Sequence, residues 1–87
     1  MTTKTPEQLV SVYGDMVYRL AYAQTRSRHD ADDIFQEVFL QTVRKRPVFD
    51  SVEHEKAWLL RVAGNLCKNR LKYNSLRQTD ELREELI

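Results

Sequence analysis

The chain has 87 residues, 41% of them hydrophobic, and a formal net charge of +1, which fits one domain with a modest core. Two glycines and two prolines are too few for a turn-rich β architecture, and the single cysteine, Cys67, excludes an internal disulfide and fits a reducing cytosol. Nothing resembles a signal peptide or the roughly 20-residue apolar run of a membrane span, so we expect a soluble, cytoplasmic protein without a membrane partner.

The first predicted helix spans residues 5–26. Thr5 is a good N-cap, Pro6 suits the first helical position, and Gln8 can complete a capping box. Apolar residues then recur at helical spacing, namely Leu9, Tyr13, Met16, Val17 and Leu20. Such a stripe could form a groove for a partner, but apolar helix stripes normally build bundles, so we favour a core role.

The second predicted helix spans residues 27–45. Ser27 is its expected N-cap, acidic residues fill its first turn, and Pro47 prevents its continuation. The predicted core face is centred on Ile34 and also contains Ala31, Phe35, Val38 and Thr42.

The opposite face of this helix is unusual because it is also partly apolar. It carries Asp32, Asp33, Gln36, Leu40 and Val43, with Phe39 at its border. One interpretation is a helix sandwiched between two others. The alternative is a docking face, apolar at its centre and rimmed by carboxylates and an amide, as protein interfaces usually are.

The third predicted helix spans residues 51–73, with Asp50 or Ser51 as its N-cap. Its predicted core face contains Leu59, Val62, Ala63, Leu66 and Tyr73. A polar loop is expected at 74–79, followed by a short helix over 80–87 that Thr79 or Asp80 would cap. The predicted fold is therefore a single all-α domain over residues 1–87, a compact bundle of three main helices plus a short C-terminal helix.

The other face of the third helix forms what we call the basic row. Its members are Trp58, Arg61, Asn65, Lys68, Asn69 and Lys72. No Asp or Glu occurs between residues 56 and 77, although acidic residues cluster at 30–37 and 80–85. This asymmetry indicates separate surfaces for separate partners.

The residue types of the basic row suit nucleic acid, but each also has a simpler explanation. Any one cation alone would be ordinary solvated surface, whereas several on one acid-free face match contacts to backbone phosphates. Asn65 and Asn69 are mediocre helix formers that stand one turn apart, and an amide both donates to and accepts from base edges. Trp58 is either a core residue or a stacking platform for an exposed base.

No catalytic or metal-binding constellation is apparent in the sequence. His29 and His54 stand at helix starts without a ligand-spaced partner, and Cys67 lies toward the core side of its helix. The acids at 30–33 lack calcium-loop spacing, and two glycines cannot make a phosphate-binding loop. We therefore expect neither an enzyme nor a protein with a cofactor, a metal or a small-molecule substrate.

Two motifs resemble region 2 of bacterial RNA polymerase sigma factors of the extracytoplasmic-function (ECF) group. They are ADDIFQEVFLQTVRK and EKAWLLRVAGNLCKNRLK, and the resemblance extends from about Leu9 to Lys72. Such domains are non-enzymatic subunits that dock on the polymerase and open the promoter. The resemblance implies the same all-α fold and the same two partners, the polymerase core and promoter DNA.

The resemblance also assigns roles to the two unusual faces. Docking on the coiled-coil of the polymerase β′ subunit, the β′ clamp helices, falls to Asp33, Gln36, Glu37, Phe39, Leu40 and Val43. Recognition and melting of the −10 element, on its non-template strand, fall to the basic row, with Asn65 and Asn69 on base edges and Trp58 beside the melting junction. The loop from residue 73 to 79 would hold a base flipped out of the stack.

One departure from the family concerns length. Family members continue into a second helical domain that reads the −35 element, so we expect either an excised domain or a natural partial factor. Many members are also held inactive by an anti-sigma factor, although no feature of this sequence shows such a partner. The alternative function is a helical protein-interaction module or partial sigma-like subunit that binds polymerase without reading DNA.

Overall fold

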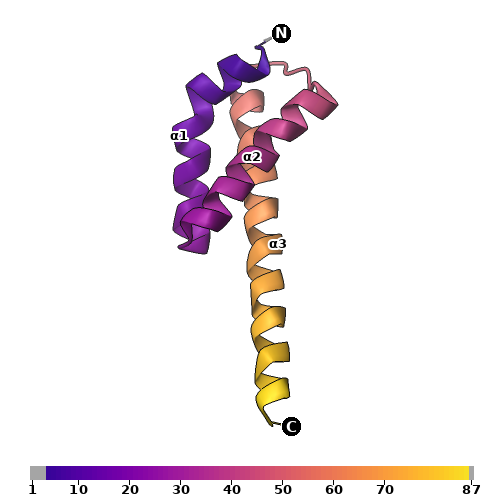
Figure 1. Ribbon diagram of the computed structural model, residues 1–87. Helices are drawn as coiled ribbons and strands as arrows, with labels where there is room; N and C mark the ends of the chain where they lie inside the picture. The colour runs from indigo at the N-terminus through magenta and orange to yellow at the C-terminus, as the bar shows by residue number, and fades with distance from the viewer. Residues whose placement is uncertain (1–3, 87) are drawn as a thin grey trace.

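The computed structural model describes the backbone of residues 4–86 and the side chains of residues 4–76. It contains α1 (Pro6–Thr25), α2 (Arg28–Lys45) and α3 (Val52–Leu86), and no β-strand lies within the described backbone. The hairpin of α1 and α2 packs against the N-terminal half of α3, whose other half projects beyond it (Figure 1). The all-α prediction is confirmed.

Side-chain caps begin all three helices at the predicted places. Thr5 and Gln8 form the reciprocal capping box, with backbone-to-side-chain bonds of 3.2 and 2.9 Å. Ser27 Oγ accepts from the backbone N–H of Asp30 at 3.2 Å. Of the two candidates for α3, Ser51 is the cap, because its hydroxyl accepts from the backbone N–H of His54 at 3.1 Å. Local sequence thus determines where each helix begins.

The predicted loop at 74–79 and the separate helix at 80–87 are wrong. The backbone is helical without a break from Val52 to Leu86, while residue 87 and the side chains of the predicted cap, Thr79 or Asp80, lie outside the described part. Two physical reasons explain the continuity. Residues 74–79 contain neither glycine nor proline, and the Asn74 amide donates to the Asp30 carboxylate of α2 at 3.1 Å, so a tertiary contact uses its polar side chain.

The core lies where the three helices meet. Its buried apolar side chains include Leu9, Tyr13, Val17, Ala21, Ala31, Ile34, Val38, Phe39, Leu59, Ala63 and Cys67. Two of the sequence predictions need correction. Tyr73 is 58% exposed because it lies past Cys67, the last core residue of α3 within the described side chains. Phe39, expected at the border of the docking face, is 7% exposed and packs in the core.

A buried acid joins α1 to α3. Glu55 is 0% exposed, and its Oε1 accepts from the Tyr13 hydroxyl at 2.7 Å and from Lys4 Nζ at 2.8 Å. A buried carboxylate is tolerated only where hydrogen bonds and an opposite charge replace its hydration. Helical spacing places Glu55 one turn before Leu59, on the core side, but the periodicity of apolar residues could not predict a buried acid there.

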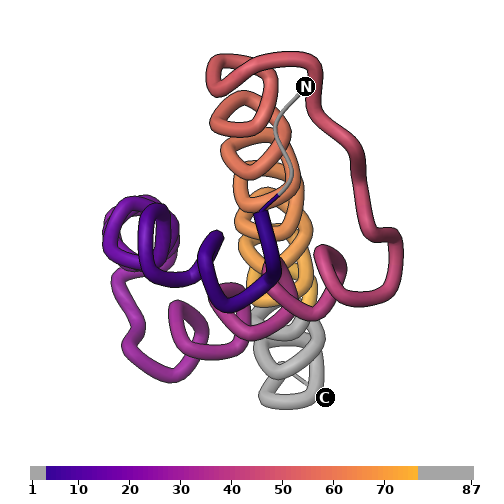
Figure 2. The backbone as a smooth tube through the Cα atoms, turned by 90° about the horizontal axis from the view of Figure 1, so that it is seen from above, coloured from indigo at the N-terminus to yellow at the C-terminus, as the bar shows by residue number. Residues whose placement is uncertain are grey.

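Viewed from above, α1 lies to one side of α3, α2 crosses α3, and the connection at 46–51 loops around the other side to the first turn of α3 (Figure 2). On another side of α3, Arg61, Asn65 and Lys68 are exposed. The fold thus leaves a long strip of the third helix open to a partner. None of the helices, over the residues described, combines the length and hydropathy of a bilayer span.

The contact between Tyr13 and Glu55 generates a first prediction. Tyr13→Phe removes the donor and keeps the ring, so the buried carboxylate loses a hydrogen bond. We expect the free energy of unfolding to fall by about 1–3 kcal/mol, measured by urea denaturation followed by circular dichroism. The matched control is Tyr22→Phe, on a ring that is 40% exposed, and it should change stability by less than about 0.5 kcal/mol. Equal effects of the two changes would contradict the role of the buried bond.

The first prediction extends to the pH dependence of the same contact. Burial, and after it the hydrogen bond to Glu55, raises the pKa of Tyr13 to about 12. The folded-state pKa thus exceeds the ordinary value of about 10, so this stabilisation is complete below about pH 10 and is lost as the pH rises through about 12. The stability difference between the unaltered chain and Tyr13→Phe should shrink across this window in urea titrations. A constant difference would exclude the linkage.

Candidate nucleic-acid and partner interfaces

The structure places the basic row on the open side of α3. Arg61, Asn65, Lys68, Asn69 and Lys72 are all exposed. Within the described side chains, none of the three cations is paired with an acid. Free cations and amides along one face of a helix can contact consecutive phosphates and base edges.

Trp58 has the first of the two roles that the sequence left open, because it is partly a core residue. It is half-buried, packs against the core cluster, and meets the ring of Phe49 edge-on at a centroid distance of 5.8 Å. Phe49 is itself 2% exposed and lies in the connection at 46–51. The indole is therefore anchored on one side and accessible on the other, a geometry that suits a stacking platform.

The predicted docking face is open at its apolar centre. Leu40 is 45% exposed, Val43 is 49% exposed, and Gln36 is exposed beside them. The interpretation of α2 as a helix sandwiched on both faces is therefore wrong. Phe39 does not belong to this surface, because it is buried against Phe35 at a ring-centroid distance of 5.0 Å.

The two predicted surfaces meet in one groove, although the sequence suggested that they were separate. This groove between α2 and α3 measures about 520 Å³. Its lining residues are Asp33, Ile34, Gln36, Glu37 and Leu40 from α2, and Leu66, Asn69, Arg70 and Tyr73 from α3. Asn69 thus stands on the boundary, within reach of both a partner docked on α2 and a strand lying along α3.

Two acidic residues of the predicted docking face, Glu37 and Asp33, are engaged within the domain. Glu37 Oε1 pairs with Arg44 at 3.3 Å, and Asp33 Oδ2 lies 3.4 Å from both His29 Nε2 and the Arg70 guanidinium. These two carboxylates, which the docking face presents to a partner, are therefore already paired within the domain. A cation brought by a docking protein would therefore compete with these contacts.

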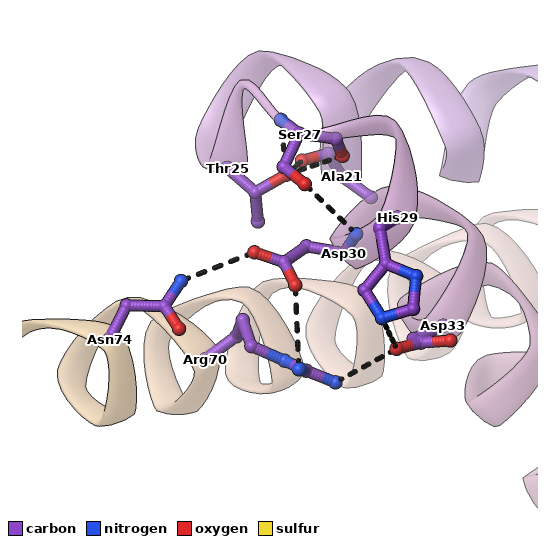
Figure 3. Close-up of polar contacts among 8 residues, drawn as sticks. All are labelled: Ala21, Thr25, Ser27, His29, Asp30, Asp33, Arg70 and Asn74. Carbon is purple, nitrogen blue, oxygen red and sulfur yellow. Dashed lines mark hydrogen bonds and ion pairs between the residues drawn. The ribbon is translucent and has the colours of Figure 1, made fainter. Parts of the chain in front are cut away.

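Arg70 is a basic residue of the acid-free stretch that does not belong to the basic row. It bridges Asp30 and Asp33 at 3.4 Å each, and Asn74 Nδ2 donates to the second oxygen of Asp30 at 3.1 Å (Figure 3). We call these four residues the polar clasp. The pattern of acids in one segment and cations in another was its only sequence signal, and that pattern specifies no pairing.

The described residues contain no group of three or more His, Cys, Asp or Glu side chains arranged to hold a metal ion. His54 Nδ1 accepts from the backbone N–H of Asp50, and Cys67 is buried, which raises the pKa of its thiol. His54 and Cys67 are thirteen residues apart on α3, so they do not form the adjacent pair of base and nucleophile that activates a thiol.

Comparison with known proteins identifies the family to which this chain is similar. Residues 9–77 match the family model described as Sigma-70 region 2. The chain is 34% identical over 64 residues to the ECF RNA polymerase sigma factor SigW of Bacillus subtilis (strain 168), a match that covers 74% of this chain and 34% of that protein.

A second relative is the ECF RNA polymerase sigma factor SigE of Mycolicibacterium smegmatis (strain ATCC 700084 / mc(2)155). It is 38% identical over 60 residues, which cover 69% of this chain and 23% of that protein. The matched segment spans about a third of SigW and less than a quarter of SigE. No solved structure gives a significant match.

The buried thiol generates a second prediction. Because Cys67 is 1% exposed and its pKa is raised, a thiol reagent can reach the thiolate only after α3 opens. We expect Ellman's reagent to react at least about 100-fold more slowly with the folded chain than with the chain in urea. The measurement is absorbance against time at pH 8. Equal rates would contradict the burial and would reopen a redox role for this cysteine.

Proposed function

This chain belongs to the sigma-70 region 2 family, and from that membership we propose that it acts with RNA polymerase in transcription initiation. In this proposal α2 docks on the polymerase and α3 recognises promoter DNA. The observation that supports it most directly is the pair of open faces on adjoining helices, one apolar with an acidic rim and one basic. A domain that bridges a protein and a nucleic acid needs such a pair.

The docking half of the proposal concerns the exposed side of α2. Leu40 and Val43 form the apolar centre, and Gln36, Asp33 and Glu37 form the polar rim. We propose that this surface binds the β′ clamp helices of the polymerase. Two exposed aliphatic side chains one turn apart suit the groove of a coiled coil, and the rim carboxylates suit its cations.

The DNA half of the proposal concerns the basic row. Arg61, Lys68 and Lys72 would contact phosphates of the −10 element, while Asn65 and Asn69 would contact base edges of its non-template strand. Trp58 would stack at the junction between paired and opened DNA, which helps to melt the duplex. Stacking and phosphate contacts together favour a single strand over a closed duplex.

The segment predicted to hold a flipped base is not a loop. Residues 73–79 are helical, so they provide no loop for a flipped base, and that assignment is withdrawn. The loop next to the basic row is the connection at 46–51, whose Phe49 contacts Trp58. Exposed Arg46 and Val48 lie in the same connection, and we propose that it contacts the opened strand.

A second candidate function is a partial sigma-like subunit that binds polymerase without reading DNA. The position of Asn69 favours it, because this side chain lines the groove together with Gln36 and Leu40 of the docking face. If Asn69 contacts the polymerase, then Asn65 is the one amide of the basic row that is left to contact a base edge. Asn65 therefore separates the two candidates.

The third prediction tests base recognition. Asn65→Ala removes an exposed amide and favours the helix, so the fold should persist. A preferred single strand is first selected from a randomised pool, and its scrambled version is the reference. We expect the preference of the chain for the selected strand to fall about tenfold, measured by fluorescence anisotropy. An unchanged preference in Asn65→Ala would favour the subunit that does not read DNA.

Arg61→Gln is the matched control for this experiment. Loss of a phosphate contact should weaken binding to both strands equally and reduce the slope of log affinity against log salt by about 0.7. A change in sequence preference in this control would contradict the assignment of Arg61 to the backbone.

The fourth prediction tests docking. Leu40→Asp places a charge at the apolar centre of the proposed surface, next to Gln36 and Glu37. We expect affinity for a β′ clamp-helix fragment to fall at least about tenfold, measured by calorimetry, without loss of helix content. Val12→Asp is the control, since Val12 is 58% exposed on α1. Equal affinity of Leu40→Asp and the unaltered chain would exclude this face of α2.

A further inference from the structure

We propose that Asp30 is a positioning residue for DNA recognition, because the polar clasp that it forms with Arg70 and Asn74 holds the part of α3 that carries Asn69 and Lys72. The effect of Asp30 on DNA binding rests on the proposed function. The clasp itself is a property of the fold and can be tested without DNA.

The clasp is built around the carboxylate of Asp30, whose side chain is 13% exposed. Asp30 Oδ1 pairs with the Arg70 guanidinium at 3.4 Å, and Asp30 Oδ2 accepts from Asn74 Nδ2 at 3.1 Å (Figure 3). Arg70 and Asn74 are one turn apart on α3, and both reach the same turn of α2. Asp33, the next acid on that face of α2, binds the other nitrogen of Arg70 at 3.4 Å. Two acids of one helix thus hold consecutive turns of another.

The clasp lies on α3 just past the point where packing in the core ends. Cys67 is the last side chain of α3, within the described part, that is buried in the core. Beyond it Leu71 is 39% exposed, and Tyr73 and Leu76 are each 58% exposed. Apolar packing therefore weakens where α3 leaves the bundle, and polar contacts with α2 take its place.

The basic row is divided by this boundary. Arg61 and Asn65 lie in the segment held by Leu59, Ala63 and Cys67. Asn69 and Lys72 lie beyond Cys67, next to Arg70 and before Asn74. A long helix anchored only through its first half can bend or fray in its second half. The clasp therefore controls how far Asn69 and Lys72 stay in line with the rest of the row.

The first experiment tests the holding step by hydrogen exchange. Asp30→Asn keeps the shape of the side chain and removes the charge that Arg70 binds. We expect the backbone amides of residues 71–76 to exchange about fivefold faster or more, with little change at 59–66. Asp32→Asn is the matched control, with the same charge change on an exposed residue of the same helix. Equal exchange in the two variants would overturn the clasp.

The second experiment tests the positioning step with paired substitutions. Lys72→Gln and Arg61→Gln are each measured for affinity to the selected single strand, in the unaltered chain and in the Asp30→Asn chain. We expect Asp30→Asn to lower affinity about threefold to tenfold and to leave docking on the β′ fragment within about twofold. The loss from Lys72→Gln should then be smaller in the Asp30→Asn chain, while the loss from Arg61→Gln should be the same in both.

The outcomes separate the clasp from the proposed function. A general loss of stability would reduce the contributions of Lys72 and Arg61 alike, and that result would overturn positioning. Faster exchange with unchanged DNA affinity would also overturn it. If the unaltered chain binds no DNA, the proposed function fails and the positioning role fails with it, whereas hydrogen exchange still decides whether the clasp holds α3.

Discussion

The orientation of α3 depends on a carboxylate that has lost its contact with water. Glu55 lies at the crossing of α1 and α3, where Tyr13 and Lys4 bind it. A buried carboxylate is strongly destabilising without such partners. The contacts of Glu55 therefore fix the rotation of α3 about its own axis relative to α1. Helical periodicity then directs Leu59 into the core and leaves Arg61 and Lys68 on the open side.

A second polar tie stands at the other end of the bundle. Asp30 holds Arg70 and Asn74, and the apolar core lies between this clasp and Glu55. The apolar contacts supply most of the stabilisation but little direction, since the hydrophobic effect is non-directional. The hydrogen-bonded acids supply direction. The two ties together orient a helix that extends well past Cys67, its last buried side chain within the described part.

The meeting of the two open faces has a consequence for function. Asn69 and Arg70 of α3 share a groove with Gln36 and Leu40 of α2, so a protein bound on α2 would form a wall of the same groove. Docking and DNA recognition need not be independent in such a geometry, because each partner alters the surface that the other meets. Linkage requires that this effect be reciprocal for the two binding affinities.

Local patterns in the sequence were sufficient for the helical class and for the region in which each of the three helices begins, whereas the choice between Asp50 and Ser51 and the openness of α2 came from the structure. Thr5, Ser27 and Ser51 act on their own helices, so the information for capping is local. The resemblance to sigma region 2 was also available from two short motifs, and the family comparison agrees with it.

Only the tertiary structure decided which polar residues pair and where the third helix ends. Asn74 suggested a loop in the sequence, yet its amide binds Asp30 from 44 positions away, and the helix continues. Glu55 is buried because Tyr13 of another helix meets it, and Phe39 is buried because α2 turns it toward the core. Tyr73 fits the apolar period of α3 but is 58% exposed in the groove between α2 and α3. Periodicity reports which side chains share a face, whereas burial and pairing depend on what the rest of the chain brings to that face.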